Sequence, residues 1–160
     1  MRLIAAFLKL VRLPNLIFIA LTQFLFQTCI FYPLYKENIP PSDTLHFFFL
    51  LLASLLIAAA GYIINDYFDI NIDEVNKPDR MVVDKVIHRR WAIAWHFMLS
   101  TTGLLFTILA LPFFQKWYLV LANAGFIILL WVYSINFKKI FFFFFFFISL
   151  LTAWTIFIFF

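Results

Sequence analysis

Three aspartates and an asparagine stand at helical spacing directly after a long apolar segment. Asp66, Asp69 and Asp73 are separated by steps of three and four residues, and Asn65 precedes them. At about 100° per residue, a helix would place the three carboxylates within an arc of roughly 60° and all four side chains within about 100°. Such oxygen ligands suit Mg²⁺, which takes a few protein carboxylates together with phosphate oxygens and waters. The spacing therefore predicts a magnesium site that could hold a diphosphate.

Structural roles for the same residues remain open. Asp66 and Asp69 could cap a helix or form salt bridges, and Asp73, the outermost of the three, could simply be solvated. Acidic residues near membrane depth are costly, however, and they usually mark a functional site. The three histidines are not spaced as a metal-binding set, and we interpret them as interfacial or packing residues; they are His46, His88 and His96.

The elements that must position the acidic residues are membrane spans. The 160-residue chain is 66% hydrophobic and 12% charged, whereas soluble domains carry about 25% charged residues. Roughly 20 apolar residues suffice to cross a bilayer. Five segments qualify: Pro14–Leu34, Leu45–Ile64, Trp91–Phe113, Trp117–Ile135 and Ile140–Phe160. We therefore predict an all-α, multi-pass transmembrane helical bundle in the cell membrane, with residues 1–160 forming a single domain.

The distribution of positive charge predicts the orientation of this bundle. Ten of the twelve basic residues precede the first span or lie between spans two and three or four and five, which leaves only Lys36 and Lys116 in the alternate loops. By the positive-inside rule, the N-terminus and the Asn65–Arg90 segment are cytoplasmic and the Tyr35–Thr44 loop is external. Basic residues that follow membrane topology do not form the continuous patch that nucleic acid requires, so we expect no nucleic-acid partner.

Two regions of the chain differ from the apolar spans. The Asn65–Arg90 segment is the longest polar stretch, and we expect it to continue the helix of the second span as far as a break near Pro78. Residues 141–160 form a phenylalanine-rich, low-complexity tail that begins with seven consecutive phenylalanines. A homopolymer specifies no particular helix packing, although its hydropathy permits a span.

The acidic segment resembles a family signature. Asn65–Asp73, followed by Asn76–Arg80, is similar to the first aspartate-rich motif of the UbiA family of intramembrane prenyltransferases. Two weaker similarities flank it, at Arg12–Asn15 in the first span and at Tyr133–Lys138 at the end of the fourth. The three matches occur in the family's order, each at a cytoplasmic helix end. The resemblance covers about Leu10–Lys139 and fades in the phenylalanine-rich tail.

This resemblance implies an enzyme that transfers a prenyl group from a polyprenyl diphosphate donor to a lipophilic or aromatic acceptor. In such an enzyme Mg²⁺ neutralises the diphosphate, and an aromatic ring such as that of Tyr133 or Tyr67 stabilises the allylic cation. The implied metal ligands are Asn65, Asp66, Asp69 and Asp73. The residues implied to contact the diphosphate are Arg12, Asn15, Lys77, Arg80 and Lys138. The residues implied to be catalytic are Asp66, Asp69 and Tyr133.

The chain also departs from the family pattern. Family members have about nine transmembrane helices and a second aspartate-rich motif, whereas this chain has five predicted spans and no acidic residue beyond Asp84. We therefore expect the 160-residue chain to be a truncated form that does not transfer a prenyl group by itself, unless a homo-oligomer supplies two copies of the motif. Ile57–Asp73 and His88–His96 resemble bacterial family members that act on a prenylated glycerol phosphate. The resemblance therefore favours this acceptor, followed by an aromatic acid or quinone precursor.

A different class of protein could also use an acidic cluster in the membrane. A non-catalytic membrane protein, such as a cation-transporter subunit, would employ the acids as an ion site near the bilayer midplane. Here the acids lie at the cytoplasmic mouth beside Lys77 and Arg80. That position suits an anionic ligand better than a transported cation.

Overall fold

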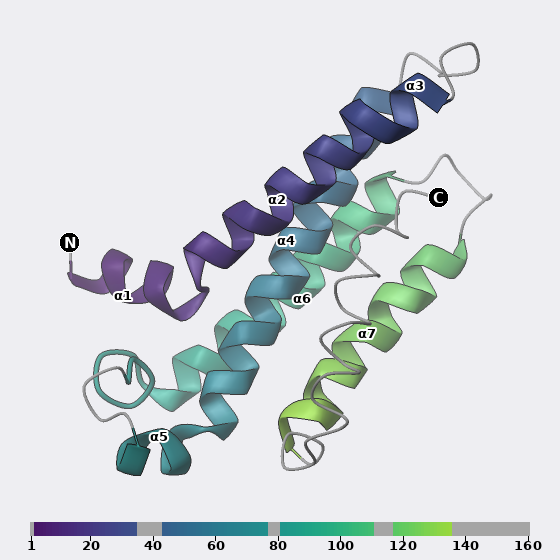
Figure 1. Cartoon of the computed structure of the whole chain (residues 1–160). Coiled ribbons are helices and arrows are strands. Elements are labelled where there is room, and N and C mark those ends of the chain that lie inside the picture. Colours follow the sequence, from purple (N-terminus) through teal and green to yellow (C-terminus); the bar gives the residue numbers. More distant parts are fainter. Residues whose placement is uncertain (1, 35–42, 77–80, 111–116, 136–160) are drawn as a thin grey trace.

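The computed structural model describes residues 2–34, 43–76, 81–110 and 117–135, and nearly all of them are helical (Figure 1). A short helix, α1, precedes the long helices, and a short helix, α5, follows α4. In chain order the elements are α1 (Arg2–Leu10), α2 (Leu13–Phe26), a π-helical turn (Gln27–Phe31), α3 (Tyr32–Leu34), α4 (Asp43–Phe68), α5 (Ile70–Asn76), α6 (Arg89–Ala110) and α7 (Trp117–Ile135).

Four helical stretches are long and apolar enough to cross a membrane, which confirms four of the predicted spans. They are Leu13–Leu34, Thr44–Phe68, Arg89–Ala110 and Trp117–Ile135. The second extends beyond its predicted end, and the third starts two residues earlier than predicted. The predicted fifth span, Ile140–Phe160, lies outside the described residues. The described part of the chain is thus a multi-pass helical bundle.

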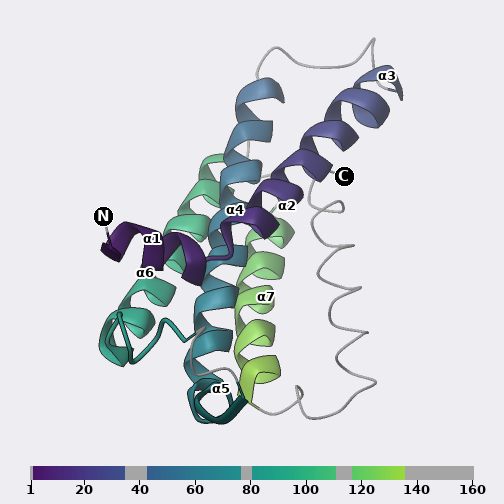
Figure 2. The same ribbon diagram turned by 60° about the vertical axis from the view of Figure 1, so that its left-hand side comes forward.

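Helix α4 occupies the centre of the bundle, in contact with α2, α6 and α7 and most extensively with α6 (Figure 2). Small residues let α4 and α6 approach closely, as is common between membrane helices. A Cβ atom added to Gly103 of α6 would lie only 2.8 Å from Cγ1 of Ile57 on α4. A larger residue at position 103 would therefore push α4 and α6 apart or displace Ile57.

Two hydrogen bonds between polar side chains join neighbouring helices inside the bundle. The hydroxyl of Ser54 on α4 donates to Oε1 of Gln23 on α2 at 2.9 Å. The amide of Asn123 on α7 donates to the hydroxyl of Thr107 on α6, also at 2.9 Å. Such partners are needed because an unpaired polar group is costly where no water is available. These bonds fix the register between helices whose apolar surfaces alone would allow sliding.

One end of the bundle gathers the polar part of the chain. Helix α5, the segment before α6 and the last turn of α7 all lie at this end, whereas α3 lies at the opposite end (Figures 1 and 2). The predicted uninterrupted helix through this region is wrong. Helix α4 ends at Phe68, and α5 begins at Ile70 after an interruption at Asp69. The expected break near Pro78 lies outside the described residues.

Candidate functional site

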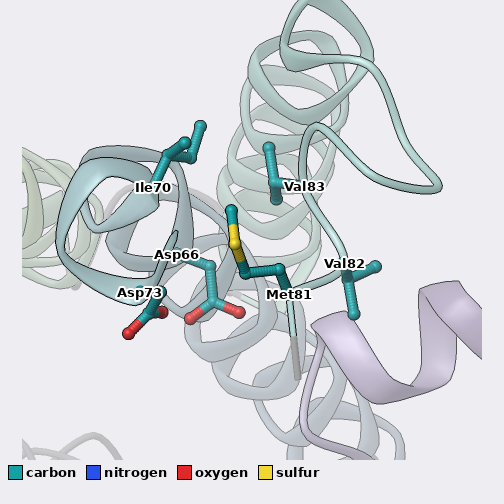
Figure 3. Close-up of a pocket in the computed structure, with 6 residues that line it drawn as sticks. All are labelled: Asp66, Ile70, Asp73, Met81, Val82 and Val83. Carbon is teal, nitrogen blue, oxygen red and sulfur yellow. The ribbon is translucent and has the colours of Figure 1, made fainter. Parts of the chain in front are cut away.

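A small cavity opens at the junction of α4 and α5. It is lined by two carboxylates and four apolar side chains: Asp66, Ile70, Asp73, Met81, Val82 and Val83 (Figure 3). Figure 3 shows the carboxylates of Asp66 and Asp73 directed to the same side of the cavity. Met81, Val82 and Val83 form the side of the cavity opposite α4 and α5. Val82 and Val83 are buried. The two acids therefore lie beside an apolar wall.

Arg12 links the first membrane span to this cavity. Its Nη2 atom donates to Oδ1 of Asp66 at 2.8 Å, and its guanidinium lies over the ring of Tyr62, 5.1 Å from the ring centroid. The side chain of Arg12 is still 43% exposed. Because a guanidinium carries five N–H donors, this contact with Asp66 leaves donors that could reach an anion bound beside it.

The backbone of Arg12 adopts a conformation that is uncommon for a residue with a side chain. Its φ of 53° and ψ of 56° are left-handed, which costs a non-glycine residue roughly 1–2 kcal/mol. Arg12 occupies the corner between α1 and α2, and Pro14 stands in the first turn of α2. Strained residues of this kind concentrate at functional sites. The corner brings the guanidinium to Asp66, which lies 54 residues away in the sequence.

Asp69 is placed differently from the other two aspartates. It is buried, with only 8% of its surface exposed, and its Oδ2 accepts a hydrogen bond from the side-chain amide of Asn65 at 3.2 Å. Its carbonyl oxygen also accepts the amide hydrogens of Ile72 and Asp73 in the first turn of α5. Asp69 is not among the residues that line the cavity. It holds the junction that sets the positions of Asp66 and Asp73.

The chemistry of this donor set fits a magnesium ion shared with a ligand. No three acidic, histidine or cysteine side chains within the described ranges are arranged to hold a metal among themselves. Mg²⁺ is commonly bound by one or two carboxylates, with phosphate oxygens and waters completing an octahedron. A cavity of about 30 Å³ is far smaller than the roughly 300–1,000 Å³ of pockets that enclose an organic ligand, and its size suits a single ion whose other ligands lie outside it.

The remaining predicted site residues are not gathered at this cavity. Asn15 lies in the first turn of α2 with an exposed side chain, and its backbone N–H donates to the backbone carbonyl of Arg12 at 2.8 Å. Tyr133 lies on α7, partly buried, and does not line the cavity. Lys77, Arg80 and Lys138 lie outside the described residues. The structure thus pairs Arg12 with Asp66 and places Asp66 and Asp73 at one cavity, and the roles of all these residues stay predictions.

Sequence reasoning missed the apolar wall of the cavity. The signal was present, because Met81–Val83 and Val86–Ile87 are short apolar runs within an otherwise polar segment. Val82, Val83 and Ile87 belong to the same hydrophobic cluster as residues of α1, α4 and α6. The polar segment is therefore anchored to the bundle, which fixes one wall of the cavity.

A buried histidine on α6 forms hydrogen bonds with both α4 and α7. In His96 on α6, Nδ1 lies 2.9 Å from the carbonyl oxygen of Ala60 on α4, and Nε2 lies 2.6 Å from Nε1 of Trp131 on α7. An indole N–H can only donate, so Nε2 accepts and Nδ1 donates to Ala60. The ring of Trp131 in turn packs edge-on against Phe68, with ring centroids 5.7 Å apart. Phe68 is the last residue of α4 before the Asp69 junction.

Comparison with known proteins shows what this chain is similar to. The profile of the UbiA prenyltransferase family matches residues 24–160. Digeranylgeranylglyceryl phosphate synthase of Methanoregula boonei is 38% identical over 110 residues, which are 69% of this chain and 37% of that protein. The protein of the same name from Sulfolobus acidocaldarius is 32% identical over 158 residues, 94% of this chain and 50% of that protein.

A solved structure also resembles the fold. It comes from work on digeranylgeranylglyceryl phosphate synthase in membranes and superimposes with a TM-score of 0.69 at 23% sequence identity. The match covers 87% of this chain and 46% of the other. The chain thus spans half or less of the length of the proteins it matches here.

Proposed function

Because this chain belongs to the UbiA prenyltransferase family, we propose that it takes part in Mg²⁺-dependent transfer of a prenyl group from a polyprenyl diphosphate within the membrane. The observation that carries this proposal is the pair of carboxylates, Asp66 and Asp73, at one cavity beside the guanidinium of Arg12. Carboxylates that could bind a divalent cation and a cation that could bind phosphate oxygens are what a diphosphate requires. Asp66, near the end of α4, and Asp73, in α5, lie at one end of a bundle of helices long and apolar enough to span a membrane.

The proposed roles of the residues follow from their positions. Asp66 and Asp73 would hold Mg²⁺ directly, while Asn65 and Asp69 support them from the helix junction or complete the ligand set. The bound ion would neutralise the diphosphate as it leaves the allylic carbon. Arg12 would keep Asp66 in place and direct its remaining N–H groups to the diphosphate. Asn15, Lys77, Arg80 and Lys138 are proposed as further diphosphate contacts, and Tyr133 as a ring that stabilises the cation.

For the acceptor, we propose a prenylated glycerol phosphate. The proposal is supported by the relatives from Methanoregula boonei and Sulfolobus acidocaldarius, which are both named digeranylgeranylglyceryl phosphate synthase. In the reaction the bond between the allylic carbon and the diphosphate oxygen breaks, and the carbon forms a new bond to an oxygen of the acceptor, which loses its proton. An aromatic acid is the next candidate for the acceptor.

Transfer of a radiolabelled geranylgeranyl group tests this function. Because the chain spans half of the Sulfolobus acidocaldarius relative, the assay joins it to the part of that relative that has no counterpart here. In membranes containing the joined protein, we expect Mg²⁺-dependent labelling of geranylgeranylglycerol phosphate and none of 4-hydroxybenzoate. The chain alone should label neither. Transfer by the chain alone would favour a homo-oligomer, and labelling of 4-hydroxybenzoate instead would refute the proposed acceptor.

We also propose that the end of the bundle bearing the cavity faces the cytoplasm. In the sequence, ten of the twelve basic residues precede the first span or follow the second or fourth span, and the positive-inside rule makes these segments cytoplasmic. Cysteine labelling in a Cys29→Ser background tests this orientation. His88 is exposed at the cavity end, and Trp117 is exposed at the start of α7 at the other end. A membrane-impermeant maleimide should label Trp117→Cys in intact cells, but His88→Cys only after permeabilisation. The reverse pattern would overturn the proposed orientation.

A further inference from the structure

Helix α1 presents three different faces although it has only nine residues. Three pairs of residues spaced by four share faces: Ala6 with Leu10, Ile4 with Leu8, and Ala5 with Lys9. At about 100° per residue, the directions of these pairs are separated by roughly 100–160°. The first pair is buried and the other two are exposed. The helix is thus divided lengthwise into a packing face, an exposed apolar face and an exposed face that carries a positive charge.

The packing face holds α1 firmly across the bundle. Ala6 and Leu10 are buried in the cluster that also contains Ala59 and Ile63 of α4. Phe7 packs edge-on against Trp95 of α6, with ring centroids 4.6 Å apart. Figure 2 shows α1 lying across α4 and α6 rather than along them. The direction of α1 is therefore set by contacts with two membrane helices.

The exposed apolar face has no counterpart within the described part of the chain. Ile4 is 66% exposed and Leu8 is 38% exposed. The next helix along the chain, α2, also exposes apolar side chains in its first turns, where Ile17 and Phe18 are 58% and 71% exposed. α2 is part of a stretch long and apolar enough to span a bilayer, so lipid is the surrounding that suits this part of its surface. Because α1 directly precedes α2 in the chain, lipid is also a suitable surrounding for the exposed apolar face of α1.

The third face of α1 carries a positive charge, which suits the water–membrane interface and not the bilayer interior. Lys9 is exposed on it, and the side chain of Arg12 is partly exposed at the corner that follows. A lysine on such a helix can keep its charge in water while its hydrocarbon stem lies along apolar surface. Helices with one apolar and one basic flank settle at the headgroup level of membranes, and anionic lipids strengthen their binding.

We propose that α1 is an interfacial helix that lies in the plane of the membrane surface, with Ile4 and Leu8 in lipid and Ala5 and Lys9 toward water. Its partner is the headgroup region of a bilayer that contains anionic phospholipid. Because α1 ends at the corner formed by Arg12, this position of α1 places the Arg12–Asp66 pair at the membrane surface. The proposal concerns the exposed faces of α1, whose residues are not among those that line the cavity, and it does not depend on the reaction.

Measurements of membrane depth on single-cysteine variants test the proposed position of α1. The whole chain, with Cys29→Ser and one of Ile4→Cys, Ala5→Cys, Leu8→Cys or Lys9→Cys, is labelled with a polarity-sensitive fluorophore. It is then reconstituted into vesicles of phosphatidylcholine and phosphatidylglycerol. Quenching is compared between a lipid that carries a nitroxide near its headgroup and acrylamide in the water. Phe18→Cys on the lipid-facing surface and His88→Cys in the exposed loop serve as the lipid and water references.

The pattern of quenching decides the outcome. We expect the ratio of lipid to water quenching to be several-fold higher for Ile4→Cys and Leu8→Cys than for their neighbours Ala5→Cys and Lys9→Cys. Equal access of acrylamide to all four positions would show that α1 stands in water and would overturn the proposal. Protection of Ile4→Cys and Leu8→Cys from both quenchers would show that a protein surface covers them. That result would also refute the proposal that they lie in lipid.

Discussion

Replacing Asp66 by asparagine is expected to lower prenyl transfer by the joined protein by a factor of about 10²–10³, the usual effect of removing one electrostatic group at a reacting centre. The substitution keeps the size of the side chain but removes the negative charge that faces the cavity and meets Arg12 at 2.8 Å. Mg²⁺-dependent binding of geranylgeranyl diphosphate should weaken as well, by at least the roughly 10–100-fold that loss of a supporting ligand costs at metal sites.

Asp84→Asn is the matched control for this experiment. Asp84 is an exposed carboxylate in the same polar segment and also pairs with an arginine, Arg89, at 3.0 Å. Its backbone is left-handed with a φ of 75°, a conformation that asparagine tolerates. Turnover and diphosphate binding should stay close to those of the unchanged protein. If Asp66→Asn behaved like Asp84→Asn in both assays, Asp66 would be a structural partner of Arg12 and not a metal ligand.

Replacing His96 by alanine is expected to destabilise the bundle by about 2–5 kcal/mol. Truncating a large buried side chain leaves a cavity, which costs about 2–5 kcal/mol in protein cores, and an interhelical hydrogen bond within a membrane adds about 0.6 kcal/mol. His96 is 1% exposed and bonds to both Ala60 and Trp131. Unfolding of the purified chain in mixed detergent micelles measures the loss, and His88→Ala, at an exposed histidine, should change stability little.

A double-mutant cycle isolates the hydrogen bond from the cavity. Trp131→Phe keeps an aromatic ring beside Phe68 but removes the N–H that donates to His96. Alone it should cost about 0.6–1.7 kcal/mol. In the His96→Ala background it should cost nothing or restore some stability, because it removes a donor that has lost its acceptor. Additive effects of the two substitutions would show that the bond contributes nothing to holding α6 and α7 together.

The sequence by itself determined the features that depend on local composition and spacing. Hydropathy predicted the four spans that the structure confirms, because about 20 apolar residues suffice to make a segment membrane-spanning. The acidic motif of Asn65–Asp73 and its flanking matches identified the family that the profile confirms. Both the spans and the motif can be recognised without tertiary structure, because each depends on residues that are close together along the chain.

Only the tertiary structure decided which of the candidate residues meet. The spacing of Asp66, Asp69 and Asp73 predicted one stripe on one helix, but the interruption at Asp69 separates α4 from α5 and leaves Asp69 buried against Asn65. Arg12 reaches Asp66 because α1 and α2 meet at a left-handed corner that packing against α4 and α6 holds in place. Contacts between residues 54 positions apart depend on how helices cross, and hydropathy and local spacing carry no information about that crossing.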